Sequence, residues 1–357
     1  MSFSAPYKLK KLPPELIELE TKPVLKQCIK SSTALASLNH AAVRLPNKEV
    51  LLNTLSLLEA QSSSEIENIV TTTDALFKYD TLGTPVDLNT KEAMRYRHAL
   101  FSGYNELKKR PVSTKIAEKV CSVIKGLEIS VRKVPGTKLI NEKTGEITYW
   151  PPEGESHLRE LLSNWEQFIH TESDIEPLIR MAVAHYQFEA IHPFIDGNGR
   201  TGRIINLLIL KDMGLLTEPV LYLSRYINQT RSEYYRLLLR VTLEDDWESW
   251  ILYMLKAVET TSHWTLAKIN KITNLMESTK QEIIGRAPKI YSAELVNVIF
   301  EQPYCQIKNL VEVLEISRQT ASHYLSSLCD IGILIEKRES KTKLFMNPEL
   351  IQTLKGE

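Results

Sequence analysis

One short stretch of the sequence, from His192 to Arg203, gathers groups that could bind and transfer a phosphate. It reads HPFIDGNGRTGR, and its three glycines fall within six residues just before a predicted helix. Glycines at such a place leave backbone N–H groups uncovered, which is how a chain builds a cradle for an anion. Arg200 and Arg203 add two permanent cations whose forked guanidinium groups match phosphate oxygens. The stretch therefore predicts a phosphate-binding site.

Two other residues of this stretch could supply a metal ligand and a base. Asp196 offers a single carboxylate, which is enough to anchor a Mg²⁺ ion that otherwise binds phosphates and waters. His192 is the one group nearby that can move a proton near neutral pH. A lone histidine before a loop more often caps a helix end. Beside Asp196 and the two arginines, a catalytic role for His192 becomes the favoured hypothesis.

Other nucleotide-binding motifs do not fit this stretch. Its glycines match the dinucleotide pattern G-x-G-x-x-G, but that pattern needs a preceding strand within a βαβ unit, and here a long apolar helix precedes. The loop has no Gly-Lys-Ser/Thr sequence, so it is not a P-loop. The His-Arg-Asp and Asp-Phe-Gly segments of protein kinases are also missing from the chain.

The stretch resembles the signature of the Fic (Fic/Doc) family, in which HPFx(D/E)GNGRxxR is the active-site loop. All the defining positions match, and the resemblance extends over roughly residues 1–260. It implies a Fic helical fold with a β-hairpin flap. It also implies a protein adenylyltransferase, which moves AMP from ATP to a Tyr, Thr or Ser hydroxyl of a target protein, or of itself, and releases pyrophosphate.

The resemblance further implies a role for individual residues. His192 would take the proton from the incoming hydroxyl, and Asp196 would hold Mg²⁺ against the α- and β-phosphates. Arg200 and Arg203 would offset charge on the departing pyrophosphate. The implied nucleotide-binding residues are Glu67, Gly197, Asn198, Gly199, Arg200, Thr201, Gly202, Arg203 and Tyr235. Of these, Tyr235 resembles the adenine side of the family's site, although an aromatic residue on a helix is more often part of a core.

A second signal lies upstream of the loop. Residues 63–68, SSEIEN, match the (S/T)xxxE(G/N) motif that in this family marks an inhibitory helix. By resemblance, Glu67 would pair with Arg203 and occupy the space that the γ-phosphate of ATP needs. Ser62 and Glu65 form a capping-box pattern, so we expect a helix to begin at Ser62 and the inhibitory helix to lie near residues 62–78. The alternative is a solvated glutamate in the first turn of that helix, where negative charge is favoured.

The elements that must position these residues are mainly α-helical. We expect an N-terminal helical region over 1–115 and a catalytic core over 116–257, in which Pro177 opens the apolar helix before the loop. Residues 131–152 place β-branched residues around a Lys-Thr-Gly-Glu turn and predict a hairpin. This flap could dock an extended segment of a target protein by strand pairing, or it could be a structural ribbon.

The C-terminal part of the sequence predicts a separate unit. Residues 247–285 have helical periodicity over a length that suggests two helices, and 258–288 would form a helical linker. Residues 289–357 show three helices and a hairpin, the pattern of a winged helix-turn-helix. Their eight Lys and Arg against nine Asp and Glu give a net charge of −1, whereas a DNA-binding unit is normally basic. DNA binding and contacts between proteins, including a homodimer, both remain open.

Composition excludes several classes of protein. With 357 residues the chain can form two or three domains, and 44 basic against 44 acidic residues give no overall attraction to nucleic acid or to an anionic membrane. No apolar run approaches 18 residues, and the four cysteines form no short-spaced pair. We therefore expect a cytoplasmic protein without a membrane partner. Transfer of UMP, phosphate or phosphocholine, removal of AMP, and a nucleotide-sensing DNA-binding regulator are the alternative functions.

Overall fold

The structure is a computed structural model that describes residues 3–15, 17–44, 48–83, 87–140, 144–171, 173–339 and 342–355. Within these ranges the chain is mainly helical, as expected, and its strands form two small antiparallel sheets. The first half contains α1 (Lys22–Arg44), α2 (Lys48–Ile66), α3 (Thr73–Leu82), α4 (Leu88–Glu106), α5 (Thr114–Lys125) and α6 (Glu155–His170). The middle contains α7 (Pro177–Ile191), α8 (Asn198–Asp212), α9 (Leu223–Gln229), α10 (Arg231–Glu244) and α11 (Trp247–Arg286).

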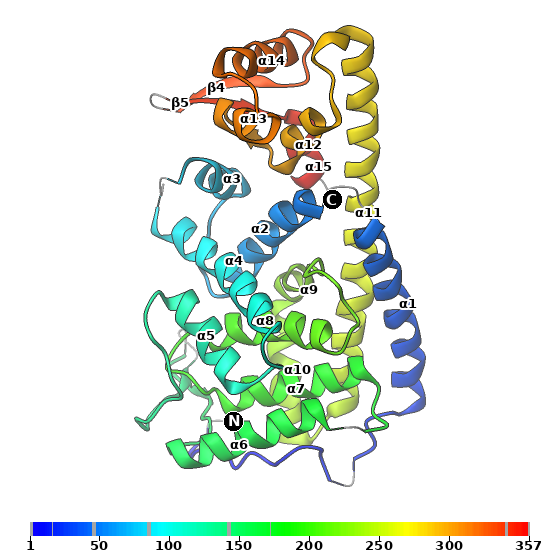
Figure 1. Ribbon diagram of the computed structural model, residues 1–357. Helices are drawn as coiled ribbons and strands as arrows, with labels where there is room; N and C mark the ends of the chain where they lie inside the picture. The colour runs from blue at the N-terminus through cyan, green and yellow to red at the C-terminus, as the bar shows by residue number, and fades with distance from the viewer. Residues whose placement is uncertain are drawn as a thin grey trace.

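Helices α7 and α8 form the centre of the lower half of the molecule (Figure 1). Nearly all the residues of both helices are buried. Helix α7 is apolar on almost every side, as a helix in the middle of a core requires, whereas α8 also buries polar residues such as Arg200 and Arg203. Pro177 lies at the start of α7, where its missing N–H is not needed, so the predicted beginning of this helix is confirmed. Helices α4, α5 and α6 pack around the pair. The loop between α7 and α8 is therefore held by two rigid, buried elements.

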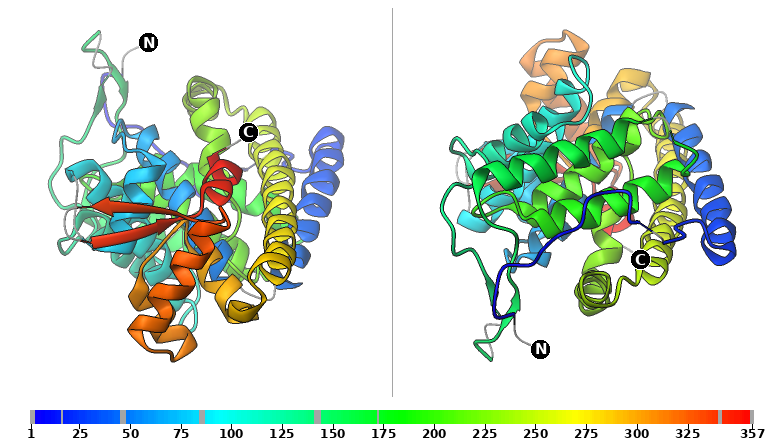
Figure 2. Two further views of the ribbon diagram at one scale, coloured as in Figure 1. Left: turned by 90° about the horizontal axis from the view of Figure 1, so that it is seen from above. Right: turned by 90° about the horizontal axis from the view of Figure 1, so that it is seen from below.

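The predicted hairpin is present but short. Its strands are β1 (Leu139–Ile140) and β2 (Ile147–Tyr149), which pair antiparallel with an irregular register. Lys143 of the expected turn lies outside the described residues. The hairpin projects from the helical body, close to the N-terminus (Figure 2). Leu139 and Ile140 are 38% and 53% exposed, so one strand of the hairpin offers apolar side chains to solvent.

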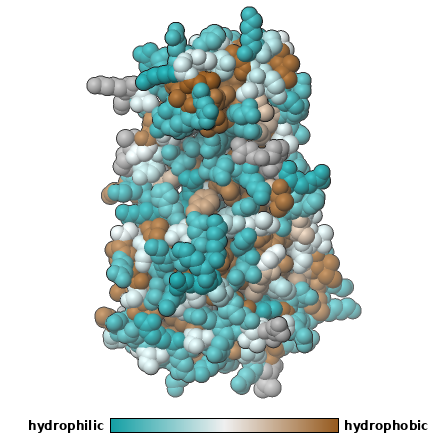
Figure 3. Space-filling model, in the orientation of Figure 1, coloured by the Kyte–Doolittle hydropathy of each residue, from teal (hydrophilic) through white to brown (hydrophobic). Residues whose placement is uncertain are grey.

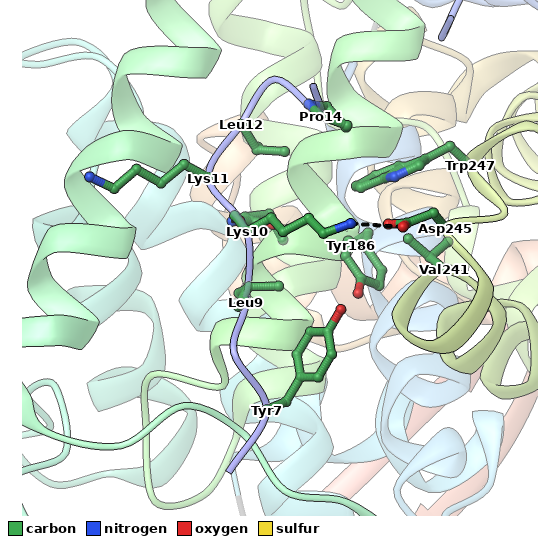
Figure 4. Close-up of a pocket in the computed structure, with 11 residues that line it drawn as sticks. Tyr7, Leu9, Lys10, Lys11, Leu12, Pro14, Tyr186, Val241, Asp245 and Trp247 are labelled. Carbon is green, nitrogen blue, oxygen red and sulfur yellow. Dashed lines mark hydrogen bonds and ion pairs between the residues drawn. The ribbon is translucent and has the colours of Figure 1, made fainter. Parts of the chain in front are cut away.

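Residues 3–15 cross the helical body as an extended strap (Figure 4). The backbone N–H of Tyr7 donates to the carbonyl of Trp150 over 2.8 Å, directly after β2. The ammonium group of Lys10 lies 2.7 Å from the carboxylate of Asp245 at the end of α10. The pocket beneath the strap measures about 20 Å³, room for about one water molecule. Through these two contacts the strap links the hairpin to the end of α10.

Helix α11 runs along one side of the whole molecule (Figure 1). The prediction of two helices over residues 247–285 is wrong, because the structure has one 40-residue helix of about 60 Å. Ile269, Ile272 and Ile283 of its second half are buried. The residues predicted to be a helical linker thus belong, for the most part, to a packed helix. A short 3₁₀ turn, η1 (Pro288–Ile290), follows it.

The C-terminal unit has the predicted winged-helix elements. These are α12 (Ala293–Glu301), β3 (Tyr304–Cys305), α13 (Ile307–Leu314), α14 (Arg318–Asp330), β4 (Ile335–Glu339) and β5 (Thr342–Met346), followed by α15 (Pro348–Lys355). The strands form one sheet in the order β3-β5-β4. The hydroxyl of Tyr304 donates to Asp74, and Lys78 pairs with Glu339. These contacts fasten the unit to α3.

The surface in the orientation of Figure 1 is mostly hydrophilic, with apolar side chains in small separate patches (Figure 3). In the ranges that the structure describes, no helix has the length and apolar character needed to cross a bilayer.

Candidate active site

The loop between α7 and α8 is shaped by two residues in the left-handed region. His192 ends α7 with φ 49°, and its backbone N–H donates to the carbonyl of Phe188. Gly197 precedes α8 with φ 86°, a conformation that favours glycine. The first amides of α8, from Asn198 onward, have no acceptor within the helix and carry its positive dipole end. A helix N-terminus therefore lies where the sequence predicts the anion cradle.

The side chain of Asn198 braces the loop. Its Oδ1 accepts from the backbone N–H of Phe194, and its Nδ2 donates to the carbonyl of the same residue, each over 2.8 Å. Phe194 is fully buried, so the bridge ties the loop to the core. Because both amide atoms are used in this way, Asn198 serves the cradle through its backbone N–H and through the loop shape that it fixes.

Two glycines of α8 make room for carboxylates. A Cβ atom at Gly199 would lie 2.5 Å from Oε1 of Glu67, and one at Gly202 would lie 2.2 Å from Oε1 of Glu189. Thr201, between them, is buried, and its hydroxyl has no hydrogen-bond partner among the described residues. The glycines of this helix are thus explained by close approach to two acidic side chains.

Arg203 is held by the predicted motif. Its side chain is 1% exposed, and its Nε and Nη2 atoms donate to the hydroxyl and the carbonyl of Ser63 over 2.8 and 2.9 Å. Nη2 also donates to Oε1 of Glu67 over 2.7 Å. Burial alone would lower the pKa of Arg203, but the negative charge of Glu67 raises it overall. The structure therefore brings Glu67 and Arg203 together.

The (S/T)xxxE(G/N) motif of residues 63–68 lies at the end of a helix, so the prediction that a helix begins at Ser62 is wrong. Helix α2 begins at Lys48, and its buried leucine stripe continues through Ser62, which outweighs the local capping pattern. The helix stops because Asn68 adopts φ 62°. The N–H groups of Ile69 and Asn68 then bond back to Ser64 and Glu65, which closes a Schellman motif. Glu67 is consequently not a solvated first-turn glutamate.

His192 is neutral at physiological pH. Burial, helped by the nearby positive charge of Arg132, lowers the pKa of its imidazole to about 4. Arg132 precedes the hairpin, and its Nε donates to the carbonyl of His192 over 2.8 Å. Its backbone N–H donates to the carbonyl of Pro193. Sequence reasoning missed Arg132, which fastens the segment before the hairpin to the loop between α7 and α8.

Asp196 carries a carboxylate that is 61% exposed and forms an ion pair with Lys125 of α5. Burial would raise the pKa of this carboxyl, but the hydrogen bond and charge of Lys125 lower it overall. The described residues contain no group of three His, Cys, Asp or Glu side chains that could hold a metal ion by themselves.

Arg200 also has an acidic partner. Its side chain is 3% exposed, and Nη1 donates to Oε1 of Glu92, in α4, over 2.7 Å. Glu92 and Lys125 had no signal in the sequence, because each comes from a helix that meets the loop only in the folded chain. With Glu92, Lys125 and Glu67 as partners, every charged side chain in residues 195–203 forms an ion pair within the chain.

The two neighbouring tyrosines of α10 differ. Tyr234 is buried, and its hydroxyl hydrogen-bonds with His185 over 2.9 Å, so both residues belong to the core. Tyr235 is 44% exposed and lies beneath the guanidinium group of Arg231. Its pKa is raised by burial and then by the negative charge of Glu67, which places its ring close to the site.

Glu189 is a further residue that the sequence did not single out. It lies one turn before His192 in α7, and burial raises the pKa of its carboxyl to about 7, against the lowering effect of Arg203. The site therefore contains two groups, His192 and Glu189, whose pKa values burial shifts in opposite directions.

Comparisons with known proteins agree with this geometry. Residues 88–210 match the family model described as Fic/DOC family, and residues 25–105 match the Fic/DOC family N-terminal model. Residues 275–350 match the C-terminal domain of SoFic-like protein adenylyltransferases. The chain is similar to the protein adenylyltransferase Fic of Drosophila willistoni, with 28% identity over 41% of this chain and 29% of that protein. It is also similar to protein adenylyltransferase fic-1 of Caenorhabditis briggsae, with 31% identity over 42% and 27%.

Solved structures share the fold. A Fic family protein from Desulfovibrio desulfuricans aligns with a TM-score of 0.58 and 17% identity, covering 94% of this chain and 98% of that one. Fic-1 from Caenorhabditis elegans aligns with a TM-score of 0.53 and 21% identity, covering 68% and 72%. The sequence alignments span less than a third of the two curated relatives described above.

Proposed function

We propose that this chain, a member of the Fic/DOC family, is a protein adenylyltransferase that moves AMP from ATP to a Tyr, Thr or Ser hydroxyl of a target protein or of itself. The observation that carries the proposal is the arrangement around α8. Its N-terminal amides, Arg200 and Arg203 surround the place for phosphates, and a neutral His192 lies at the other end of the same loop.

His192 would act as the general base. Because burial keeps its imidazole neutral at pH 7, it can accept the proton of the attacking hydroxyl. The hydroxyl oxygen forms a bond to the α-phosphorus while the bond from that phosphorus to the bridging oxygen breaks, and pyrophosphate leaves. The amides at the start of α8, with Arg200 and Arg203, offset the negative charge that develops. Tyr235 would lie beside the adenine, where its exposed ring can stack.

Mg²⁺ fits the one exposed carboxylate of the loop. This ion prefers oxygen ligands, keeps several waters and commonly binds one or two carboxylates together with substrate phosphates. Asp196, 61% exposed, would hold it, and the ion when bound would supply positive charge beside the phosphates. Lys125 already provides a positive charge there, so it would have to move or share the carboxylate.

Glu67 would inhibit the enzyme in its resting state. Its carboxylate pairs with Arg203 and lies against Gly199, so it occupies both the cation and the space at the start of α8. A triphosphate with its γ-phosphate near Arg203 would compete with Glu67 for the same N–H groups. ATP could still bind, but with its α-phosphate out of line with the incoming hydroxyl.

The hairpin would dock the target. Its first strand has exposed apolar residues, Leu139 and Ile140, and Arg132 ties its base to the loop. A target segment that paired with this strand would present its hydroxyl close to His192, whatever its other side chains. We place this reaction in a reducing cytoplasm, because the four cysteines are free thiols.

The direct test is mass spectrometry after incubation with Mg²⁺ and ATP. Wild type, Glu67→Gly and the Glu67→Gly/His192→Ala double variant are each mixed with ATP and a lysate. We expect AMP on the chain itself or on lysate proteins with Glu67→Gly, little with wild type and none with the double variant. If another group is added in place of AMP, the transferred group is wrong. If nothing is added with Glu67→Gly, the proposed function fails.

A further inference from the structure

A polar cavity of about 290 Å³ lies behind the end of α2. Helices α2, α9, α11 and α15 all contribute to its wall. The lining residues used below are Ser62, Glu65, Arg225, Asn228, Trp264 and Lys355. Its volume is at the lower end of the range for ligand pockets, so it suits a small metabolite.

The cavity and the candidate active site share one turn of α2. Ser62 and Glu65, three residues apart, face the cavity, as residues at this spacing lie on one side of a helix. Ser63 and Glu67, four residues apart, both contact Arg203. A ligand in the cavity would therefore touch the helix turn that carries the inhibitory glutamate.

The cavity wall is electropositive. Among the described residues, no carboxylate lies within ion-pair distance of Arg225, whose guanidinium group lies 4.7 Å from the centre of the Trp264 ring. Lys355 adds a second cation to the lining, and the ammonium group of Lys268 lies 5.1 Å from the centre of the Trp264 ring. Burial, and then the positive charges of Lys271 and Arg225, lower the pKa of Lys268 to about 8. Glu65 is the one acidic residue in the lining.

We propose that this cavity binds a small molecule with a carboxylate or phosphate group, and that binding loosens the hold of Glu67 on Arg203. The oxyanion would pair with Arg225, a cation of the lining that has no acidic partner among the described residues and whose Nη1 donates to Oε1 of Gln229 over 3.3 Å. The hydroxyls of Ser62 and Tyr222, which share a hydrogen bond of 2.6 Å, and the amide of Asn228 are the neutral polar groups next to it. The apolar part of the ligand would lie against Trp264.

Two hydrogen bonds explain how the cavity could act on the site, a step that rests on the proposed function. Nδ2 of Asn228 donates to Oε2 of Glu65, and Nη1 of Arg231 donates to Oδ1 of Asn68, each over 3.0 Å. These bonds hold the end of α2 against α9 and α10. A bound anion would compete for the Asn228 amide and repel Glu65, which weakens the first of these bonds.

The binding test needs a local readout, because phosphate is also expected at the active-site loop. Nitrogen-15 labelling of the five tryptophans gives one indole N–H signal for each, and Trp264→Phe assigns the signal at the cavity. Inorganic phosphate and succinate are titrated separately, which distinguishes a phosphate from a carboxylate ligand. The signals of Trp165 and Trp250, whose N–H groups donate to backbone carbonyls in the core, serve as references.

We expect the Trp264 signal to move and saturate with at least one probe while the references stay in place. Arg225→Gln should weaken binding by about tenfold or more, whereas Glu65→Gln should tighten it, because it removes the opposing charge. Arg236→Gln removes an exposed cation outside the cavity and should change nothing. No saturable shift with either probe, an unchanged affinity in Arg225→Gln, or weakening in both cavity variants would overturn the site.

The regulatory step is tested by AMP transfer at saturating ATP with and without the probe that binds. AMP transfer by wild type should rise when the probe is added. AMP transfer by Glu67→Gly should not change, because Arg203 is already free of Glu67 in this variant. Binding without stimulation of wild type would overturn the coupling. If Glu67→Gly transfers no AMP at all, the proposed function fails, while the binding result stands by itself.

Discussion

Arg203 and Glu67, 136 positions apart in the sequence, are joined by a hydrogen bond of 2.7 Å between Nη2 and Oε1. The guanidinium group that should meet the γ-phosphate is thus already occupied by a carboxylate. On the proposed function the two anions would need the same cation, so the pair of Glu67 with Arg203 and the productive complex with ATP would exclude one another. The first two predictions follow from this contact.

Replacing Glu67 by glycine should raise AMP transfer by about tenfold or more. The change frees Arg203 and the space beside Gly199 together, so ATP can align its α-phosphate with the incoming hydroxyl, and a misplacement of about 1 Å can cost a hundredfold in rate. The gain should appear in kcat, measured by incorporation of label from the α-phosphate of ATP.

Two further variants separate the contributions of charge and bulk to this inhibition. Glu67→Gln keeps the bulk but loses the charge, so strong activation of this variant would show that charge pairing dominates. Arg203→Ala should be inactive in both the wild-type and the Glu67→Gly background. Recovery of activity in that double variant would show that Arg203 merely anchors the inhibitor.

Asn68→Val should also activate the enzyme, although Asn68 does not touch Arg203. A β-branched residue at φ 62° costs about 1 to 2 kcal/mol, so the end of α2 that positions Glu67 should open more often. Asn68→Gly is the matched control, since glycine adopts this conformation freely while losing the same hydrogen bond to Arg231. Equal transfer rates in the two variants would contradict the prediction.

Lys125→Met should lower the Mg²⁺ concentration that supports nucleotide binding. The lysine neutralises the carboxylate that a metal needs, but Asp196 is largely exposed, so we expect a shift of only about two- to fivefold. The measurement is the affinity for a fluorescent ATP analogue across a Mg²⁺ titration. Asp196→Asn should shift the requirement upwards, and Lys119→Met, an exposed lysine on the same helix, should leave it in place.

In the pH profile, the fall of kcat/KM on the acid side should occur below pH 6.5. Burial holds the pKa of His192 at about 4, so the free enzyme keeps its base neutral as the pH falls from 8 to 6. Glu189, with a pKa of about 7, is the other group that could titrate in this range, so the profile is measured in Glu67→Gly with and without Glu189→Gln. A limb near 6.5 or above in the Glu189→Gln background would contradict the assignment.

The same shift predicts an effect on stability. The pKa of His192 is lower in the folded chain than the ordinary value of 6.5, so the unfolded chain binds more protons between these two values. The contribution of this group to stability is therefore complete above pH 6.5 and is lost as the pH falls towards 4. His185, whose pKa burial lowers to about 3, acts in the same direction. Glu189 acts in the opposite direction, because its raised pKa stabilises the folded chain as the pH falls below 7, so the test is made in the Glu189→Gln background. There the Tm should fall between pH 7 and pH 5, and less so when His192→Ala is added.

The sequence was sufficient for features that depend on residues close together in the chain. The loop between two apolar helices, the start of α7 at Pro177 and the winged-helix elements all follow from local patterns. The contact between Glu67 and Arg203 was predicted only from a motif, because no local sequence pattern connects residues so far apart.

The errors and omissions have physical causes. The capping pattern at Ser62 was overridden by the buried stripe of α2, since tertiary packing contributes more than one cap. Lys125 and Glu92 each reach the loop from another helix, and no spacing in the sequence marks a partner that only folding supplies.

Helix α11 bears on how this protein can be divided. The predicted boundary between residues 288 and 289 falls just beyond the end of a helix that packs against both α12 and α15. A fragment ending there would lose the packing of α11 against α12 and α15, and a fragment starting there would lose the packing of α12 and α15 against α11. Each half therefore needs the same stretch of helix to be complete. The helical body before α11 and the winged-helix unit after it are therefore not independent modules. A chimaera that joins either of them to another protein must include the whole of α11.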